Sequence, residues 1–195
     1  LGTDQLVGMS SAQVGSLTSV QVAGLSSTQV AAIETGDLRA LGTSALRALG
    51  TDLIKALTTD QVAALTTAQV ASLSTTQVGA LTTAGIVALN SADMAALNTA
   101  QLRAFGTDQF AAIETGDLRA LGTAAIRAVG TDQLNALGTD QMGALTTTQV
   151  AALGSQQVAN LGTTNLNALN TQQFASMNSA QLGAMTTTQV AAMET

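Results

Sequence analysis

Apolar and polar residues recur with a period of eight along the whole chain. When octads are labelled a to h from Leu1, position a is always large and apolar, and position f is apolar in all 24 full octads. Position c is Ser or Thr in all 25 occurrences, and position e is Gln in 16 of 24. The phase holds to Thr195 without an insertion or a deletion, so the chain is one tandem array.

The spacing of the two apolar positions favours a helix over a strand. Positions f and a are three residues apart, and residues three apart share a face of a helix. Their opposite parity would place them on opposite faces of a strand. A helix of about six residues is too short to be stable alone in water, so each one has to bury its apolar face against neighbours. We therefore predict an all-α solenoid, with one short helix per octad, that forms an elongated rod.

Two positions are candidates for the N-cap of each helix. The strict Ser or Thr at position c is what an N-cap demands, and Gly or Asn at b suits a left-handed residue that ends the preceding helix. In the alternative, b is the N-cap, the residues at a and f form a hydrophobic staple, and Gln at e closes a capping box, as in Leu57–Val62. We prefer c, because Glu34, Glu114 and Glu194 at position b would be poor caps.

The same pattern predicts how the helices stack. The residue at position h is small except at Asn160, which lets adjacent units approach closely, and Gln at e lies beside the apolar face. A ladder of Gln side chains is therefore expected along the solenoid. We expect two octads in each layer, hence about 12 layers. Phe105, Phe110 and Phe174 occupy a or f positions and are expected in the core.

Composition limits the chemistry that this chain can carry out. It contains no Cys, His, Pro, Trp or Tyr, and only 9% of its residues are charged. Without His or Cys there is no imidazole base, no thiolate nucleophile and no zinc site of the usual kind. The Gly-Thr-Asp and Thr-Gly-Asp tripeptides lack the carboxylate density of a calcium site, and no run of apolar residues is long enough to span a membrane. We therefore expect no enzyme activity, no metal, no cofactor and no membrane span.

The charged residues follow the octad as well. All six basic residues occupy position g, near the expected helix end, whereas the acidic residues lie at b, d or e near its start. This placement complements the helix dipole. Two blocks, 33–56 and 113–136, are identical at 18 of 24 positions, which segmental duplication or a recurring functional patch would each explain.

Two interpretations of these charges remain open. They form either a solvated face with local ion pairs that each contribute little, or a repeated basic stripe that contacts another rod, an acidic glycan or a partner protein. The residues of this possible lateral or partner contact are Arg39, Arg47, Lys55, Arg103, Arg119, Arg127, Glu34, Asp37, Glu114 and Asp117.

The octad resembles two known repeat types. Leu57–Ala64 resembles the first helix of a transcription-activator-like effector repeat, but the base-reading loop is missing and the net charge is −6, so no nucleic acid binding is expected. The unit Leu-Thr-Thr-x-Gln-Val-Ala-Ala, as in Leu65–Ser72 and Leu145–Ala152, resembles octapeptide repeat tracts of very large bacterial surface or secreted adhesin-like proteins. Tracts of this kind are also labelled haem-utilisation-like, and the absence of His, Cys and Tyr gives that label no support here.

The second resemblance implies a structural or adhesive role. The expected function is a stalk, fibre or filament component outside the cell or at the cell surface. The expected partners are further copies of the chain, neighbouring repeats of a longer chain, or a glycan or other cell-surface partner. Because the sequence starts at Leu1 and stops within an octad, we expect residues 1–195 to be a single array taken from a longer protein.

Overall fold

The protein is a succession of short helices. The computed structural model describes residues 2–193, which contain 24 α-helices and no strand. Each helix begins at the Ser or Thr of position c and ends at position g or h, so every octad forms one helix of five or six residues. No helix in this range combines the length and the apolar character that crossing a membrane would require. The all-α repeat architecture expected from the octad is confirmed.

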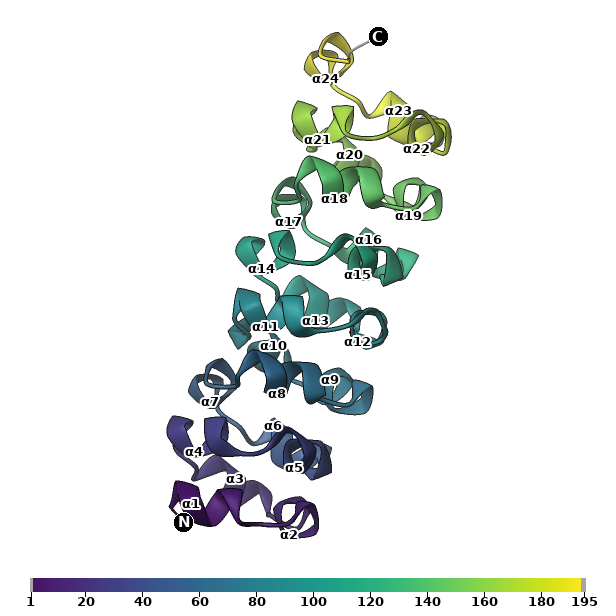
Figure 1. Ribbon diagram of the computed structural model, residues 1–195. Coiled ribbons are helices and arrows are strands. Elements are labelled where there is room, and N and C mark those ends of the chain that lie inside the picture. Colours follow the sequence, from purple (N-terminus) through teal and green to yellow (C-terminus); the bar gives the residue numbers. More distant parts are fainter. Residues whose placement is uncertain (1, 194–195) are drawn as a thin grey trace. The chain divides into compact units, whose positions relative to one another are not determined.

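The chain divides into two compact units, Leu1–Ala104 and Phe105–Thr195, and Figure 1 shows short helices following one another at corners within each. The helices of the first unit are α1 (Thr3–Val7), α2 (Ser11–Gly15), α3 (Ser19–Ala23), α4 (Ser27–Ala32), α5 (Thr35–Ala40), α6 (Thr43–Arg47), α7 (Thr51–Lys55), α8 (Thr59–Ala64), α9 (Thr67–Ser72), α10 (Thr75–Ala80), α11 (Thr83–Ala88), α12 (Ser91–Ala96) and α13 (Thr99–Arg103). Those of the second are α14 (Thr107–Ala111), α15 (Thr115–Ala120), α16 (Thr123–Ala128), α17 (Thr131–Asn135), α18 (Thr139–Ala144), α19 (Thr147–Ala152), α20 (Ser155–Ala159), α21 (Thr163–Asn167), α22 (Thr171–Ala175), α23 (Ser179–Gly183) and α24 (Thr187–Ala191).

Within each unit a helix packs on the helix three places later in the chain. In the first unit α5 packs on α2 and α8, α6 on α3 and α9, and α7 on α4 and α10. In the second unit α18 packs on α15 and α21, and α19 on α16 and α22. Three helices therefore make one turn, and each unit contains three columns of stacked helices.

The expectation of two octads per layer was wrong. The residues that link two helices, at positions a and b, are both extended at Ile33 and Glu34, and at Leu89 and Asn90. Such a linker turns the chain through a corner and does not reverse its direction, so the chain returns to the same column only after three corners. The octad specifies the shape of one corner, whereas the number of corners in a turn depends on how successive turns pack.

Position b, and not position c, is the N-cap. Thr58 has φ −71° and ψ 161°, its hydroxyl accepts from the N–H of Gln61 at 3.2 Å, and Gln61 Oε1 accepts from the N–H of Thr58 at 2.9 Å. Our preference for c was wrong, because the extended backbone defines the cap whether or not its side chain contributes. Glu34 makes no side-chain cap hydrogen bond, yet its carbonyl still accepts from the N–H of Leu38. The expected left-handed residue does not occur within residues 2–193 either, where no φ is positive.

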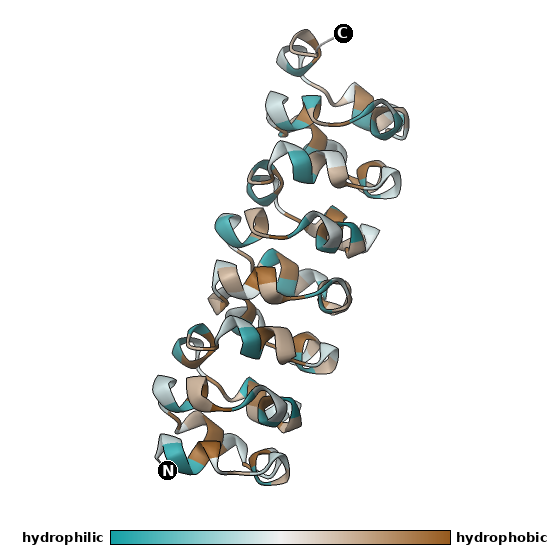
Figure 2. Cartoon of the chain, in the orientation of Figure 1, coloured by the Kyte–Doolittle hydropathy of each residue, from teal (hydrophilic) through white to brown (hydrophobic). Residues whose placement is uncertain are grey.

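The core consists of the a and f side chains. At f, Val62, Val70 and Val78 are at most 1% exposed, and Leu65 and Leu73 at a are also buried. Figure 2 shows brown apolar segments recurring between teal polar ones in every turn. Phe105 and Phe110 are buried as expected, whereas Phe174, in the last turn of the second unit, is only half-buried.

Candidate stacking interface

The Gln side chain, where it occupies position e, joins its helix to the preceding turn. Gln61, on α8, is only 2% exposed. Its Oε1 accepts from the N–H of Thr58, and its Nε2 donates to the carbonyls of Val30 and Ile33, each at 2.8 Å. These carbonyls lie at the end of α4 and at the corner that follows it. One side chain therefore satisfies the start of its own helix and the end of a helix in the preceding turn.

The same contact recurs in both units. Gln69 Nε2 donates to the carbonyls of Leu38 and Leu41, and Gln149 Nε2 to those of Leu118 and Leu121. A neutral hydrogen bond of this kind contributes about 1 kcal/mol net, and an unpaired buried amide would cost more than that. The expected Gln ladder is confirmed, although its carbonyl partners were not foreseen. The contact is also made by Gln77, Gln101, Gln133, Gln141, Gln157, Gln173, Gln181 and Gln189.

An Asp at position e makes a different contact. Asp93 is fully buried and accepts from Thr67 Oγ1 at 2.8 Å and from Asn90 Nδ2 at 2.6 Å. Asp37, which is 6% exposed, accepts from Ser11 Oγ at 2.6 Å. Because a carboxylate has no donor, it cannot bond the carbonyls that Gln reaches. It bonds a position-c hydroxyl on the helix directly beneath it instead.

Long polar side chains at position g connect a turn to the one after it. Arg127 Nε donates to the carbonyl of Ala152 at 3.2 Å, and Asn135 Nδ2 donates to that of Asn160 at 2.8 Å. These carbonyls lie at the end of the helix one turn further along. A cation at a helix C-terminus is also stabilised by the dipole. Arg127 therefore has a structural role within the solenoid.

The repeat itself is one that is known from other proteins. Six stretches of the chain match the ALTTAQ repeat: residues 1–32, 30–67, 63–91, 86–113, 110–147 and 158–195. The chain belongs to the ALTTAQ-repeat family. No curated protein matches it.

The six letters of the ALTTAQ repeat occur in this sequence as Ala64–Gln69. That segment holds the buried residue at a, the N-cap Thr66 and the Gln that reaches the preceding turn. The ALTTAQ-repeat unit therefore contains the groups that form the corner and join the turns.

The charged residues singled out in the sequence lie on different columns of the ALTTAQ-repeat solenoid. Arg39, Arg47 and Lys55 are exposed on α5, α6 and α7, which belong to the three columns of one turn, so they do not form one row. Arg103 and Arg119 are exposed as well. The contact of these residues with a partner stays a prediction.

The acidic members of that set are of two kinds. Glu34 and Glu114 are exposed N-cap residues without a side-chain cap hydrogen bond. Asp37 and Asp117 are buried at position e and lie inside the solenoid rather than on a solvated face. The sequence signal for this burial is the position itself, because e holds Gln in most octads and Gln is buried there in both units.

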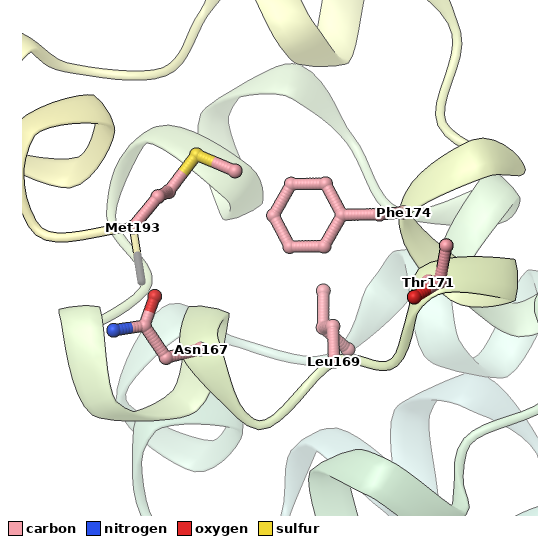
Figure 3. A pocket seen from close by; sticks show the side chains of 5 residues that line it. All are labelled: Asn167, Leu169, Thr171, Phe174 and Met193. Carbon is pink, nitrogen blue, oxygen red and sulfur yellow. The ribbon is translucent and has the colours of Figure 1, made fainter. Parts of the chain in front are cut away.

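The last turn of the second unit contains a cavity of about 330 Å³. It is lined by Asn167, Leu169, Thr171, Phe174 and Met193. Figure 3 shows the side chains of Phe174, Leu169 and Met193 around the opening, with Asn167 and Thr171 at its edge. Three of the five lining residues occupy a or f positions, which the earlier turns of this unit bury.

Proposed function

We propose that this chain is a structural segment, a stalk or fibre component that supplies length to an extracellular or cell-surface protein. The observation that carries the proposal is the repeated turn-to-turn contact. Gln61, Gln69 and Gln77 bond the preceding turn in the same way, as do Gln149 and Gln157 in the second unit. A fold in which each turn bonds only its neighbours extends by adding turns and needs no other partner for stability.

Two further features support this role. The buried polar groups are used in joining turns, as with Asp93 and the Gln residues, and none of them faces the cavity in the last turn. The resemblance of Leu65–Ser72 to octapeptide tracts of bacterial surface proteins supports the location outside the cell. The proposal includes no catalytic role, since the chain has no His or Cys and few charged residues.

Deletions of different length test this proposal. Removing residues 57–80 takes out one complete turn, α8–α10, and brings α7 next to α11 with the octad phase intact. We expect a folded protein, shorter by one helix diameter of roughly 10 Å, with unchanged helix content per residue. The measurements are small-angle scattering for the maximum dimension and circular dichroism for the helix content.

The matched control removes only residues 59–62. This deletion of four residues breaks the eight-residue period. The a and f residues after the deletion then no longer face the a and f residues before it, and apolar side chains meet polar ones. We expect a large loss of helix content. If the deletion of a whole turn disrupted folding as much as this one, the chain would not be a modular spacer.

A further inference from the structure

Position c is the strictest polar position of the octad, yet the fold does not account for it. It holds Ser or Thr in all 25 occurrences, whereas the N-cap position b also accepts Gly, Asn and Glu. At b the hydroxyl is used, since those of Thr58 and Thr66 each accept from a backbone N–H within a capping box. The hydroxyl that the helix start uses is therefore replaceable, whereas the hydroxyl at c is kept in every octad.

The c hydroxyls of several helices have no partner within the protein. Thr59, Thr75 and Thr83 in the first unit, and Thr139 and Thr147 in the second, are exposed, and within residues 2–193 their hydroxyls make no hydrogen bond. Both Ser and Thr occur at c, so the shared hydroxyl is the constant feature and the methyl group of Thr is not. A helix start alone would also accept Ala, Pro, Asp or Glu at its first residue. We infer that the hydroxyl is kept for a role outside the helix.

Some c hydroxyls are instead engaged inside the solenoid. Ser11 Oγ donates to Asp37 at 2.6 Å, and Thr67 Oγ1 donates to the fully buried Asp93 at 2.8 Å. Each of these Asp residues occupies position e, where most octads have Gln, and a carboxylate needs a donor that Gln does not need. Engaged and unengaged hydroxyls at the same octad position therefore provide a comparison within one chain.

The surface around the c hydroxyls is poor in charge. Only 9% of the residues are charged, whereas roughly 25–35% is typical of the surface of a soluble protein. Val87 is 45% exposed on α11, and Ala63, Ala71 and Ala84 are exposed as well. Such a surface favours association between rods unless other polar groups hydrate it. Neutral polar groups attached to the exposed hydroxyls would supply that hydration.

A covalent attachment suits these hydroxyls better than the binding of a free ligand. Ligand sites are concave and are lined by apolar or aromatic side chains around a few polar groups. The chain has no Trp or Tyr, and Phe105 and Phe110 are buried in the core. In contrast, a c hydroxyl such as that of Thr139 is exposed between the small residues Gly138 and Asp140, which leaves it accessible as an acceptor.

We propose that the exposed c hydroxyls are acceptors for O-linked neutral sugars. The hydroxyl oxygen attacks the anomeric carbon of a nucleotide-activated sugar bound to a glycosyltransferase. The new C–O bond forms as the bond from the anomeric carbon to the diphosphate breaks. The nucleoside diphosphate leaves with the bonding electrons, and a base of the transferase takes the hydroxyl proton. Thr59, Thr75 and Thr83 each follow an extended N-cap residue, so one transferase that recognises this setting is sufficient for all of them.

Stacking distributes the acceptors along and around each unit. Thr35, Thr59 and Thr83 lie on α5, α8 and α11, which pack on one another in one column. Packed helices are roughly 8–10 Å apart, so neighbouring acceptors in a column can be reached separately. The three helices of a turn place acceptors on all three columns. The inference rests on the proposed role as a cell-surface stalk, and it names the modification that keeps such a stalk hydrated.

Site-resolved mass spectrometry of the chain, isolated from the cells that produce it, tests the proposal. We expect sugar masses at Thr59, Thr75 and Thr83, and none at Ser11 or Thr67, whose hydroxyls are bonded to buried carboxylates. A chain without sugars, sugars spread equally over positions b, c and d, or equal occupancy of Thr59 and Thr67 would each overturn the proposal. These results leave the spacer role standing, because the two deletions test that role separately.

Two sets of substitutions separate modification from a structural role of the hydroxyl. The c set removes three acceptors and consists of Thr59→Ala, Thr75→Ala and Thr83→Ala. The matched b set removes the N-cap hydroxyls of the same helices and consists of Thr58→Ala, Ser74→Ala and Thr82→Ala. In the producing cells, the c set should lose the sugars of three acceptors, and the b set should lose none. Sugars that are lost from the b set instead would contradict the assignment to c.

The same two sets are then compared as unmodified protein, made in cells without the transferase. We expect the c set to keep the urea midpoint of the wild-type chain, because its hydroxyls make no hydrogen bond within residues 2–193. The b set should unfold at a lower urea concentration, because its hydroxyls accept from the N–H groups of Gln61, Gln77 and Gly85. A c set that is destabilised as much as the b set would show that the helix itself requires the c hydroxyl, which would overturn the proposal.

Discussion

Two neighbouring turns of the first unit use the same octad in opposite ways. In α8–α10 the N-caps are Thr58, Thr66 and Ser74, each closed by a Gln in a capping box. In α5–α7 the N-caps are Glu34, Gly42 and Gly50, and none of them makes a side-chain hydrogen bond. The first of these turns bonds the turn beneath it through Gln side chains, whereas the second has no Gln at all.

The turn α5–α7 is held by other means. Position e is occupied by Asp37, Ala45 and Leu53, so from this position only Asp37 makes a polar contact with the preceding turn, by accepting from Ser11 Oγ. Ser19 Oγ adds a second polar contact, to the carbonyl of Ser44 at 3.2 Å. It is also the turn that carries Arg39, Arg47 and Lys55 near the ends of its helices, where a cation is favoured. The comparison indicates that the a and f positions define the solenoid, and that the polar contacts at b and e are interchangeable within it.

The largest expected effect on stability comes from replacing the amide of one buried Gln with a carboxylate. Gln69→Glu places a carboxylate against the carbonyls of Leu38 and Leu41, at a site only 2% exposed. We expect a loss on the order of 3 kcal/mol in the free energy of unfolding at pH 7, because a buried charge then faces two acceptors. Urea unfolding followed by circular dichroism measures this loss.

The control is Gln21→Glu, at the same octad position but exposed in the first turn. It should change stability by no more than about 0.5 kcal/mol. The penalty of the Gln69→Glu substitution should also depend on pH. Burial raises the pKa of the introduced carboxyl above its unfolded value of about 4.3, so the penalty grows as pH rises through that value and disappears in more acidic solution. Equal losses for the two variants would show that the carbonyl contact contributes nothing.

A smaller effect is expected from the one polar contact beneath α5. Ser11→Ala removes the hydroxyl that donates to Asp37 at 2.6 Å and leaves that carboxylate oxygen without this donor. We expect a loss of about 1.5–3 kcal/mol, as for a hydrogen bond to a charged group. Ser27→Ala, at the same position c on α4, is the matched control and should be close to neutral. Hydrogen exchange of the α5 amides would locate the loss, and unchanged exchange would contradict the contact.

The smallest effect is expected from exchanging the caps of the two turns. Gly50→Thr adds a hydroxyl at an extended N-cap where an added Cβ meets nothing within 4 Å, and Thr66→Gly removes one. The first should stabilise and the second destabilise, each by roughly 0.5–1 kcal/mol. If both substitutions shifted the urea midpoint in the same direction, the stability of the N-cap would depend on the surrounding turn and not on the N-cap side chain.

Much of this architecture was readable from the sequence. The strict period indicated one helix per octad, and the spacing of three between f and a identified the buried face. Gln at e was correctly placed beside the core, as Gln61 and Gln69 show. These features are local, because they depend only on which residues a helix brings to one side.

Other features of the fold could not be decided from the sequence. The N-cap could be b or c by residue type, and only the extended backbone of residues such as Thr58 and Glu34 decides for b. The carbonyl partners of Gln61 lie 28 and 31 residues earlier in the chain, a separation that the octad alone does not define. Whether Arg39, Arg47 and Lys55 form one row depended on the number of helices in a turn, because three helices per turn place them on three columns.

The repeating helix, its buried face and the class of its polar contacts thus followed from the order of the residues alone. Packing in three dimensions set how many helices close a turn and which carbonyls each Gln meets. The two levels differ because burial pattern and capping are properties of adjacent residues, whereas stacking depends on corner angles that add up over three helices before two surfaces meet.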